Sequence, residues 1–254
     1  MRIATPARFF GSDLREDAHV TTPDCTYVFI PGAGGSGWSF SFVVAELERR
    51  GRRAIAVDLP AGDDRAGFDA YADAVVAAIG DRPRPVLVAS SLAGFTAPRV
   101  CARVPVALVV LLNAMIPAPG ETAGAWWEAT GHAEARAEQA ARDGRAVDDG
   151  DILGDFFHDV PPDVTAEAMA QGELRQSATP FGDAPLGTPW PDVPTRVLVG
   201  RDDRFFPAAF QRRVAQERLG IAADELPGGH LLALSRPGDL ADRLERYWGE
   251  VAGA

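Results

Sequence analysis

The sequence of 254 residues contains no lysine, so all 25 of its strongly basic side chains are arginines. Chemistry that needs a lysine amine is therefore excluded, including Schiff-base catalysis, lysine-bound pyridoxal phosphate and the Walker phosphate-binding loop. The arginines are outnumbered by 36 acidic residues, which gives a net charge of −11 at pH 7. A chain with this balance lacks the basic surplus that a nucleic-acid or anionic-membrane partner requires.

Cysteine and long apolar segments are scarce as well. Cys25 and Cys101 fall at the start of an expected strand and within an expected helix, so we interpret them as reduced, packed thiols rather than a disulfide framework. Residues 1–24 carry charges throughout and lack the apolar segment of a secretory signal. No apolar run approaches the length of a membrane span. We therefore expect a cytoplasmic protein with no membrane partner.

Short apolar runs alternate with helical patterns over most of the chain. Continuously apolar runs are typical of parallel strands buried on both faces of a sheet, and their repetition with helices predicts a doubly wound α/β fold. The expected strands lie at 27–30, 54–58, 86–89, 107–112 and 196–200, with a short one near 225–226. The expected helices lie at 38–50, 68–79, 92–102 with a kink at Pro98, 207–219 and 239–248.

This rhythm breaks between residues 114 and 190, a stretch rich in proline and glycine. We predict that it is a helical cap inserted over the carboxyl edge of the sheet, while residues 1–113 and 191–254 form the core. Five of its residues are candidates for a substrate pocket between cap and sheet: Trp126, Trp127, Phe156, Phe157 and His158. The alternative is that the aromatic residues pack the cap onto the core and that His158 has a structural or entrance role.

A strand expected to end at small residues precedes the segment Ala89-Ser90-Ser91-Leu92-Ala93-Gly94. A serine in a tight turn between strand and helix has a strained backbone that exposes its hydroxyl above the sheet. Ser91 is the candidate nucleophile rather than Ser90, because the residues two positions before and after it are alanines. The alternative is that the serine pair only caps the helix.

A reactive serine needs a base to take its proton, and the base needs an acid to orient it. His230 is the candidate base because it follows Gly228-Gly229 after the last expected strand. Asp202 and Asp203 follow another strand, and either carboxylate is a candidate acid. Taken singly, Asp203 is consistent with a helix cap and His230 with a surface loop. Together, the chain order Ser, Asp, His is that of a catalytic triad.

The loop Gly32-Ala33-Gly34-Gly35 follows the first clear strand and opens a helix. Such a loop brings backbone N–H groups close to a ligand, so we expect an oxyanion hole formed by the N–H groups of Ala33 and Leu92. The alternative is a phosphate-binding loop. That alternative is disfavoured because the glycine spacing is not G-x-G-x-x-G and no Walker lysine follows.

Four motifs occur in order along the chain: Ile30-Pro31-Gly32-Ala33-Gly34-Gly35 with Trp38, the Ser91 turn, Gly200-x-x-Asp203-x-x-x-Pro207, and Gly229-His230. On these motifs the chain resembles the α/β-hydrolases, and within them the compact branch of plant methyl esterases, hydroxynitrile lyases and actinobacterial relatives. The resemblance covers residues 26–113 and 195–254. It implies that Asp203, rather than Asp202, is the acid. The chain departs from the family pattern at Pro31, where histidine is usual, and at the alanines that replace the glycines around Ser91.

The resemblance also bears on the reaction. Hydroxynitrile lyases carry a lysine beside the catalytic histidine, whereas here Leu231 follows His230, so lyase chemistry of that type is disfavoured. Epoxide hydrolases and dehalogenases of this fold use an aspartate nucleophile, and Ser91 disfavours both. We therefore expect a serine hydrolase, without metal or organic cofactor, that cleaves a small to medium, largely apolar ester, thioester or lactone. The alternatives are a non-hydrolytic ligand-binding receptor, and acyl-transfer, lyase or cyclisation chemistry in a biosynthetic pathway.

Overall fold

The computed structural model describes residues 24–148, 150–172, 174–185 and 187–253, so the expectations for residues 1–23 lie outside the described residues. Within this part of the chain, six strands form one sheet in the order β2-β1-β3-β4-β5-β6, and every neighbouring pair is parallel. Their bounds are β1 Thr26–Ile30, β2 Arg53–Ala56, β3 Pro85–Ser90, β4 Leu108–Leu112, β5 Thr195–Gly200 and β6 Asp224–Leu226. The predicted parallel sheet of an α/β protein is confirmed.

Three of the four inner strands, β1, β3 and β4, are buried at every position, which accounts for their continuously apolar sequences. Val28, Leu87 and Val109 lie side by side in register and face one hydrophobic core. Their neighbours along each strand, such as Phe29 and Val88, face a second core on the other side of the sheet. The two cores therefore need helices on both faces.

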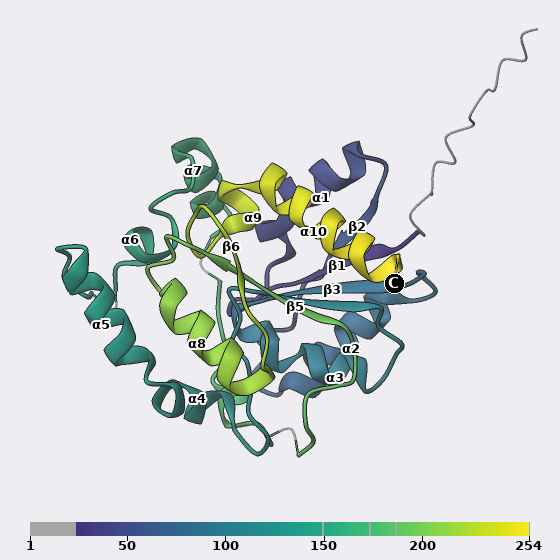
Figure 1. The fold of residues 1–254 in the computed structure, drawn as a ribbon, viewed down its shortest axis with the longest axis horizontal. Helices are drawn as coiled ribbons and strands as arrows, with labels where there is room; N and C mark the ends of the chain where they lie inside the picture. The colour runs from purple at the N-terminus through teal and green to yellow at the C-terminus, as the bar shows by residue number, and fades with distance from the viewer. Residues whose placement is uncertain (1–23, 149, 173, 186, 254) are drawn as a thin grey trace, which may run out of the picture.

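Helices cover each face of the sheet as the predicted fold requires (Figure 1). One face is covered by α1 Ser41–Arg49, α9 Leu232–Ser235 and α10 Pro237–Ala252. The other is covered by α2 Phe68–Ile79, α3 Ala97–Cys101 and α8 Ala208–Leu219. The helix expected at 92–102 is divided into a 3-10 helix η2 Ser91–Phe95 and α3, with Pro98 in the first turn of α3, where its missing N–H is not needed.

Four helices lie between β4 and β5, in the stretch for which a cap is expected: α4 Ala123–Thr130, α5 His132–Arg142, α6 Ile152–Phe156 and α7 Pro162–Ala170. Figure 1 shows them gathered along one side of the molecule. Trp126 of α4 is fully buried against Phe206 and Phe210, and its indole N–H donates to the carbonyl of Ile116 at 3.1 Å. This tryptophan packs α4 onto the sheet domain.

The remaining short elements are the 3-10 helices η1 Gly37–Phe40 and η3 Thr179–Gly182. η3 contacts α4, and η1 links the glycine loop after β1 to α1. Among the described helices, none is both long enough and apolar enough to cross a membrane.

Candidate active site

Ser91 directly follows β3 with a backbone φ of 52°, a conformation that residues other than glycine seldom adopt. Small neighbours permit the turn. A Cβ atom on Gly32 would lie 2.7 Å from the Cβ of Ser91, and one on Gly94 would overlap the carbonyl of Met115. The backbone N–H of Met115 in turn donates to the Ser91 carbonyl at 2.9 Å. Close approaches to neighbouring atoms in this turn therefore fall at Gly32 and Gly94.

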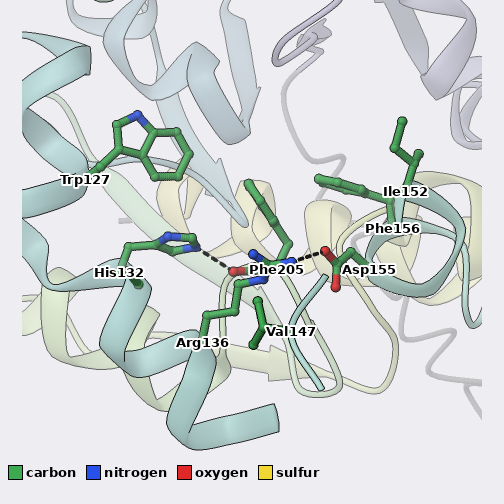
Figure 2. Close-up of a pocket in the computed structure, with 9 residues that line it drawn as sticks. Trp127, His132, Arg136, Val147, Ile152, Asp155, Phe156 and Phe205 are labelled. Carbon is green, nitrogen blue, oxygen red and sulfur yellow. Dashed lines mark hydrogen bonds and ion pairs between the residues drawn. The ribbon is translucent and has the colours of Figure 1, made fainter. Parts of the chain in front are cut away.

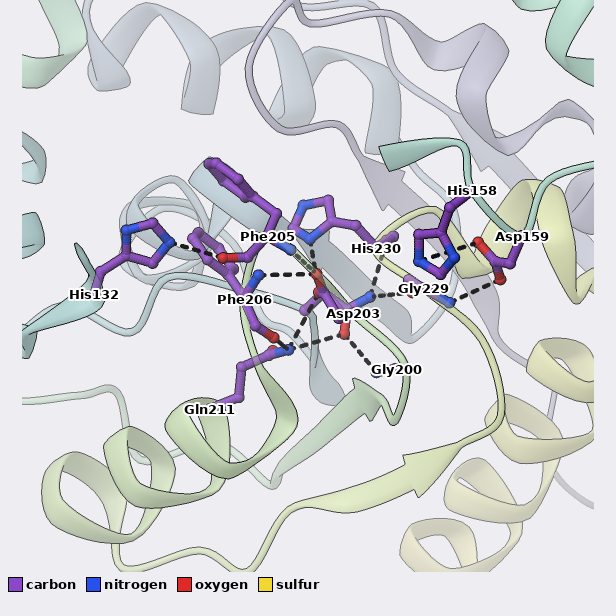
Figure 3. Close-up of polar contacts among 11 residues, drawn as sticks. His132, His158, Asp159, Gly200, Asp203, Phe205, Phe206, Gln211, Gly229 and His230 are labelled. Atoms are coloured by element: carbon purple, nitrogen blue, oxygen red, sulfur yellow. Dashed lines mark hydrogen bonds and ion pairs between the residues drawn. The ribbon is translucent and has the colours of Figure 1, made fainter. Parts of the chain in front are cut away.

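Asp203 and His230 form a buried pair, since Nδ1 of His230 lies 2.8 Å from Oδ2 of Asp203 and the two residues are only 2% and 4% exposed (Figure 3). The other carboxylate oxygen accepts the backbone N–H groups of Phe205 and Phe206 at 2.9 and 2.8 Å. These bonds fold the loop after β5 around Asp203. The N-cap of α8 is Pro207, so Asp203 does not cap that helix.

Asp202 lies on the other side of the same loop, with an exposed side chain. Its Oδ2 accepts the N–H of Gly228 at 3.0 Å, and its own N–H donates to the carbonyl of Gly228 at 2.9 Å. Asp202 therefore ties the loop after β5 to the loop that carries His230, while Asp203 contacts the imidazole itself.

Three phenylalanine rings pack edge-on against the imidazole of His230. The ring centroids of Phe156, Phe205 and Phe206 lie 5.2, 5.5 and 5.2 Å from that of His230. This aromatic cage and the bond to Asp203 fix the plane of the imidazole. No hydrogen bond joins Ser91 to His230 within the described residues, although parallel strands place both residues at the carboxyl edge of one sheet.

The glycine loop after β1 runs beside the Ser91 turn, as the close approach of Gly32 shows. In the described part of the chain, the N–H groups of Ala33 and Leu92 donate to no other residue. The N–H of Gly34 is taken by Oε1 of Gln176 at 3.0 Å. These two N–H groups remain the candidate donors of the expected oxyanion hole.

A cavity of about 410 Å³ lies between α5 and α6 (Figure 2). Its aromatic lining is Trp127, Phe156 and Phe205, and its polar lining includes His132, Arg136 and Asp155. Arg136 and Asp155 are ion-paired at 2.5 Å. Ser91 and His230 do not line this cavity. Because Phe156 and Phe205 also contact the imidazole, one aromatic layer separates the cavity from His230.

The five predicted pocket residues are thus dispersed. Trp127 and Phe156 line the aromatic cavity, whereas Trp126 is buried in core packing and Phe157 lines neither this cavity nor a polar one of about 450 Å³. His158 lines the polar cavity, and its Nε2 would lie 2.8 Å from a Cβ atom on Gly229. The loop with His158, between α6 and α7, therefore rests directly on the loop of His230.

Two other histidines near the site are largely buried. Burial lowers the pKa of His132 and of His158, and the guanidinium groups of Arg136 and Arg204 respectively act in the same direction. Both imidazoles are therefore biased toward the neutral form. In the ranges that the structure describes, no group of three or more His, Cys, Asp or Glu side chains is placed to hold a metal ion.

Two residues outside the predicted site join it. Gln211 of α8 contacts the carboxylate of Asp203, and Asn113, directly after β4, contacts the carbonyl of His230. A weak signal for Asn113 is its position after an expected strand, at the same sheet edge as the other candidates. Gln211 follows Phe210 in α8, and no sequence pattern distinguishes its buried amide from a solvated one.

The sequence of this chain is similar to those of known proteins. The sequence model of the alpha/beta hydrolase family matches residues 27–243. A protein of rice, Oryza sativa, described as probable esterase PIR7A is 28% identical over 255 residues, which cover 87% of this chain and 95% of the rice protein.

Solved structures also resemble this chain. A pyrethroid hydrolase from Sphingobium faniae JZ-2 superposes with a TM-score of 0.72 at 24% identity, covering 91% of this chain and 100% of the other. Polyneuridine aldehyde esterase superposes with a TM-score of 0.69 at 18% identity, covering 88% and 99%. At these identities the likeness demonstrates a shared fold.

Proposed function

The chain belongs to the α/β-hydrolase family, and from this premise we propose that it is a serine hydrolase that cleaves a small to medium, largely apolar carboxylic ester, thioester or lactone. The observation that carries the proposal is the buried hydrogen bond between Asp203 and His230. A carboxylate paired with Nδ1 fixes the imidazole tautomer and leaves Nε2 as the basic atom. The strained turn at Ser91, at the same sheet edge, supplies the hydroxyl.

In the proposed reaction, Oγ of Ser91 attacks the ester carbonyl while Nε2 of His230 takes its proton. Asp203 accepts the Nδ1–H of His230 and stabilises the imidazolium that forms. The N–H groups of Ala33 and Leu92 donate to the negative oxygen of the tetrahedral intermediate. A hydrogen bond between Ser91 and His230 is expected to form on substrate binding, as catalytic hydrogen bonds often complete their geometry only in the substrate complex.

The intermediate collapses when the C–O bond to the alcohol breaks and His230 gives its proton to the leaving oxygen. A water molecule then attacks the acyl-enzyme, with His230 taking one of its protons. Collapse of the second intermediate releases the carboxylic acid and returns the proton from His230 to Oγ of Ser91. The cycle needs no metal or organic cofactor, because each proton moves between substrate, water and imidazole.

Two further observations support the class of substrate. Relatives of this chain are described as a probable esterase, a pyrethroid hydrolase and an aldehyde esterase, which favours ester hydrolysis. Trp127 and Phe156 line an aromatic cavity next to the His230 cage, which favours an apolar group on the substrate.

The test uses the purified full chain, a fluorophosphonate probe and p-nitrophenyl esters of increasing acyl length. We expect Ser91→Ala not to be labelled by the fluorophosphonate probe, and its kcat to be lower by at least about a thousandfold, because the nucleophile is absent. The adjacent buried Ser90 is the matched control, and Ser90→Ala is expected to keep both. The proposal is wrong if the wild type neither labels nor turns over any ester, or if Ser91→Ala behaves like the wild type.

A second candidate is a ligand-binding protein that does not turn its ligand over. The observation in its favour is that the aromatic cavity is lined by neither Ser91 nor His230. It predicts that an apolar ester raises the melting temperature of the wild type and of Ser91→Ala equally, without product. Product formation by the wild type, but not by Ser91→Ala, contradicts this second candidate.

A further inference from the structure

Asn113 has an unusual place at the end of β4. It is fully buried, and its φ of 44° lies in the left-handed region. Asparagine adopts this conformation more readily than most side chains, since its short amide satisfies nearby backbone groups. The conformation turns the chain out of the strand and holds the amide among three backbone groups.

The amide of Asn113 connects two loops of the site. Its Nδ2 donates to the carbonyls of Gly229 and His230 at 3.2 and 2.9 Å. Its Oδ1 accepts the N–H of Gly200, the last residue of β5, at 2.6 Å. Only this orientation of the amide pairs each donor with an acceptor. One side chain therefore sets the separation between the strand end that leads to Asp203 and the loop that carries His230.

Gln211 reaches the same network from α8 and is also buried. Its Nε2 lies 2.7 Å from the carbonyl of Phe206 and 3.3 Å from Oδ2 of Asp203 (Figure 3). It also lies 3.4 Å from Oδ1 of Asn113. The Oδ2 atom of Asp203 is the one that binds His230, so Gln211 and the imidazole share one acceptor.

We propose that Asn113 and Gln211 are positioning residues that hold the Asp203–His230 pair in its reactive geometry. This inference rests on the proposed serine-hydrolase function. Asn113 holds the backbone of His230, and Gln211 donates to the carboxylate that stabilises the imidazolium. Neither amide touches Ser91 in the described structure, so both act through the pair rather than on the substrate.

The two amides have opposite expected effects on the hydrogen bond between His230 and Asp203. Without Gln211, Oδ2 of Asp203 loses a competing donor, so its bond to Nδ1 of His230 strengthens. Without Asn113, the loop of His230 is less firmly held, so the bond from Nδ1 to Asp203 weakens. General destabilisation of the fold does not predict opposite signs.

The decisive measurement is the NMR chemical shift of the Nδ1–H proton of His230 in the full chain labelled with ¹⁵N-histidine. The His230 signal is assigned from its loss in His230→Asn. We expect Gln211→Met, which keeps the volume, to move this proton downfield and Asn113→Ser to move it upfield, because a stronger hydrogen bond deshields its proton. Gln216→Met is the matched control, because that glutamine is exposed on the same helix, α8.

Kinetics provide a second readout. Both variants are expected to lower kcat for an ester about tenfold while KM changes less than about twofold, because neither amide contacts substrate. In Asn113→Asp, the new carboxylate oxygen faces two carbonyls once ionised. Its activity is therefore expected to fall more steeply than that of the wild type as the pH rises and the new carboxyl group ionises.

The outcomes separate the two proposals. If the Nδ1–H chemical shift of His230 is unchanged in Gln211→Met and Asn113→Ser, and both are folded, the positioning proposal is overturned even where the wild type hydrolyses esters. If the chemical shifts move as expected but the wild type hydrolyses no ester, the positioning role stands and the proposed function fails. Should Asn113→Ser not fold, Gln211→Met alone decides, by the sign of the shift.

Discussion

The carboxylate of Asp159 accepts the backbone N–H of Gly229, the residue before His230, at 2.8 Å. Asp159 lies between α6 and α7, in the segment expected to be the cap. The fit is close, since a Cβ atom on Gly229 would lie 2.6 Å from the other carboxylate oxygen. The segment expected to cover the site therefore also holds the loop of the proposed base.

We predict that Asp159→Ala lowers kcat/KM for an ester about tenfold. A hydrogen bond to a charged group contributes about 1.5–3 kcal/mol, and its loss loosens the His230 loop without removing a reacting group. Steady-state kinetics and melting temperature are measured together. Asp163→Ala, at an exposed carboxylate of α7, is the matched control and is expected to match the wild type. Equal kinetics in the two variants would count against an anchoring role for Asp159.

Gln176 makes the corresponding contact to the proposed oxyanion loop through the N–H of Gly34. We predict that Gln176→Ala lowers kcat roughly threefold to tenfold with little change in KM, because loss of one neutral hydrogen bond displaces the neighbouring N–H of Ala33. Gln171→Ala tests the same substitution at an exposed glutamine. A change in KM alone would instead place Gln176 against the substrate.

The neighbouring aspartates after β5 permit a direct comparison. Asp203→Asn keeps the shape of the side chain but removes the charge that orients His230, and we expect kcat to fall about 10³–10⁴-fold. Asp202→Asn keeps an acceptor for the Gly228 N–H and is expected to change kcat less than about threefold. The two variants are assayed with one ester at saturating concentration. Comparable losses in both would contradict the assignment of Asp203 as the acid.

The sequence was sufficient to predict the parallel sheet, because short, continuously apolar runs separated by helical patterns are typical of strands buried on both faces. It also predicted that Asp203 and His230 come together, since both follow strands that end at one sheet edge. The choice of Asp203 over Asp202 needed the family motif, because alternation along a loop does not tell which carboxylate faces inward. In the structure, Asp203 is buried and Asp202 is exposed.

The cap residues could not be placed in the same way. Trp126 and Trp127 are adjacent in sequence, yet one is buried against Phe206 and the other lines the cavity. Aromatic residues in a small helical segment are equally consistent with core packing and with lining a pocket. Only the relative placement of α4, α5 and α6 distinguishes these two roles. Asn113 and Gln211 were not predicted as site residues, because the sequence does not distinguish a buried amide side chain from an exposed one.

Stability is expected to decrease as the pH falls below about 6.5, the ordinary pKa of histidine. Burial lowers the pKa of His132 in the folded protein, so the unfolded chain takes up a proton in a range where the folded one does not. One such group lowers the free energy of unfolding by at most about 1.4 kcal/mol for each pH unit of acidification. This loss begins as the pH falls below the pKa of the unfolded chain.

Urea unfolding at pH 7.5 and 5.5 tests this. His132→Gln retains a donor for the Phe205 carbonyl and is expected to lose less stability between the two pH values than the wild type does. His158 has a lowered pKa for the same physical reason, so adding His158→Gln is expected to reduce the difference further. Equal pH dependence in wild type and His132→Gln would exclude His132 as the titrating group.

The two thiols are expected to react slowly in the folded protein. Burial raises the pKa of Cys25 to about 11 and that of Cys101 to about 12, and both are free. Because the thiolate is the reactive form, ionisation alone slows reaction with Ellman's reagent at pH 8 by about a hundredfold or more relative to an ordinary cysteine. We predict two equivalents in denaturant and a rate in the folded protein that rises about tenfold per pH unit. The variant Cys101→Ser reports Cys25 alone, and rapid reaction of either thiol at pH 8 would show that its burial is incomplete in solution.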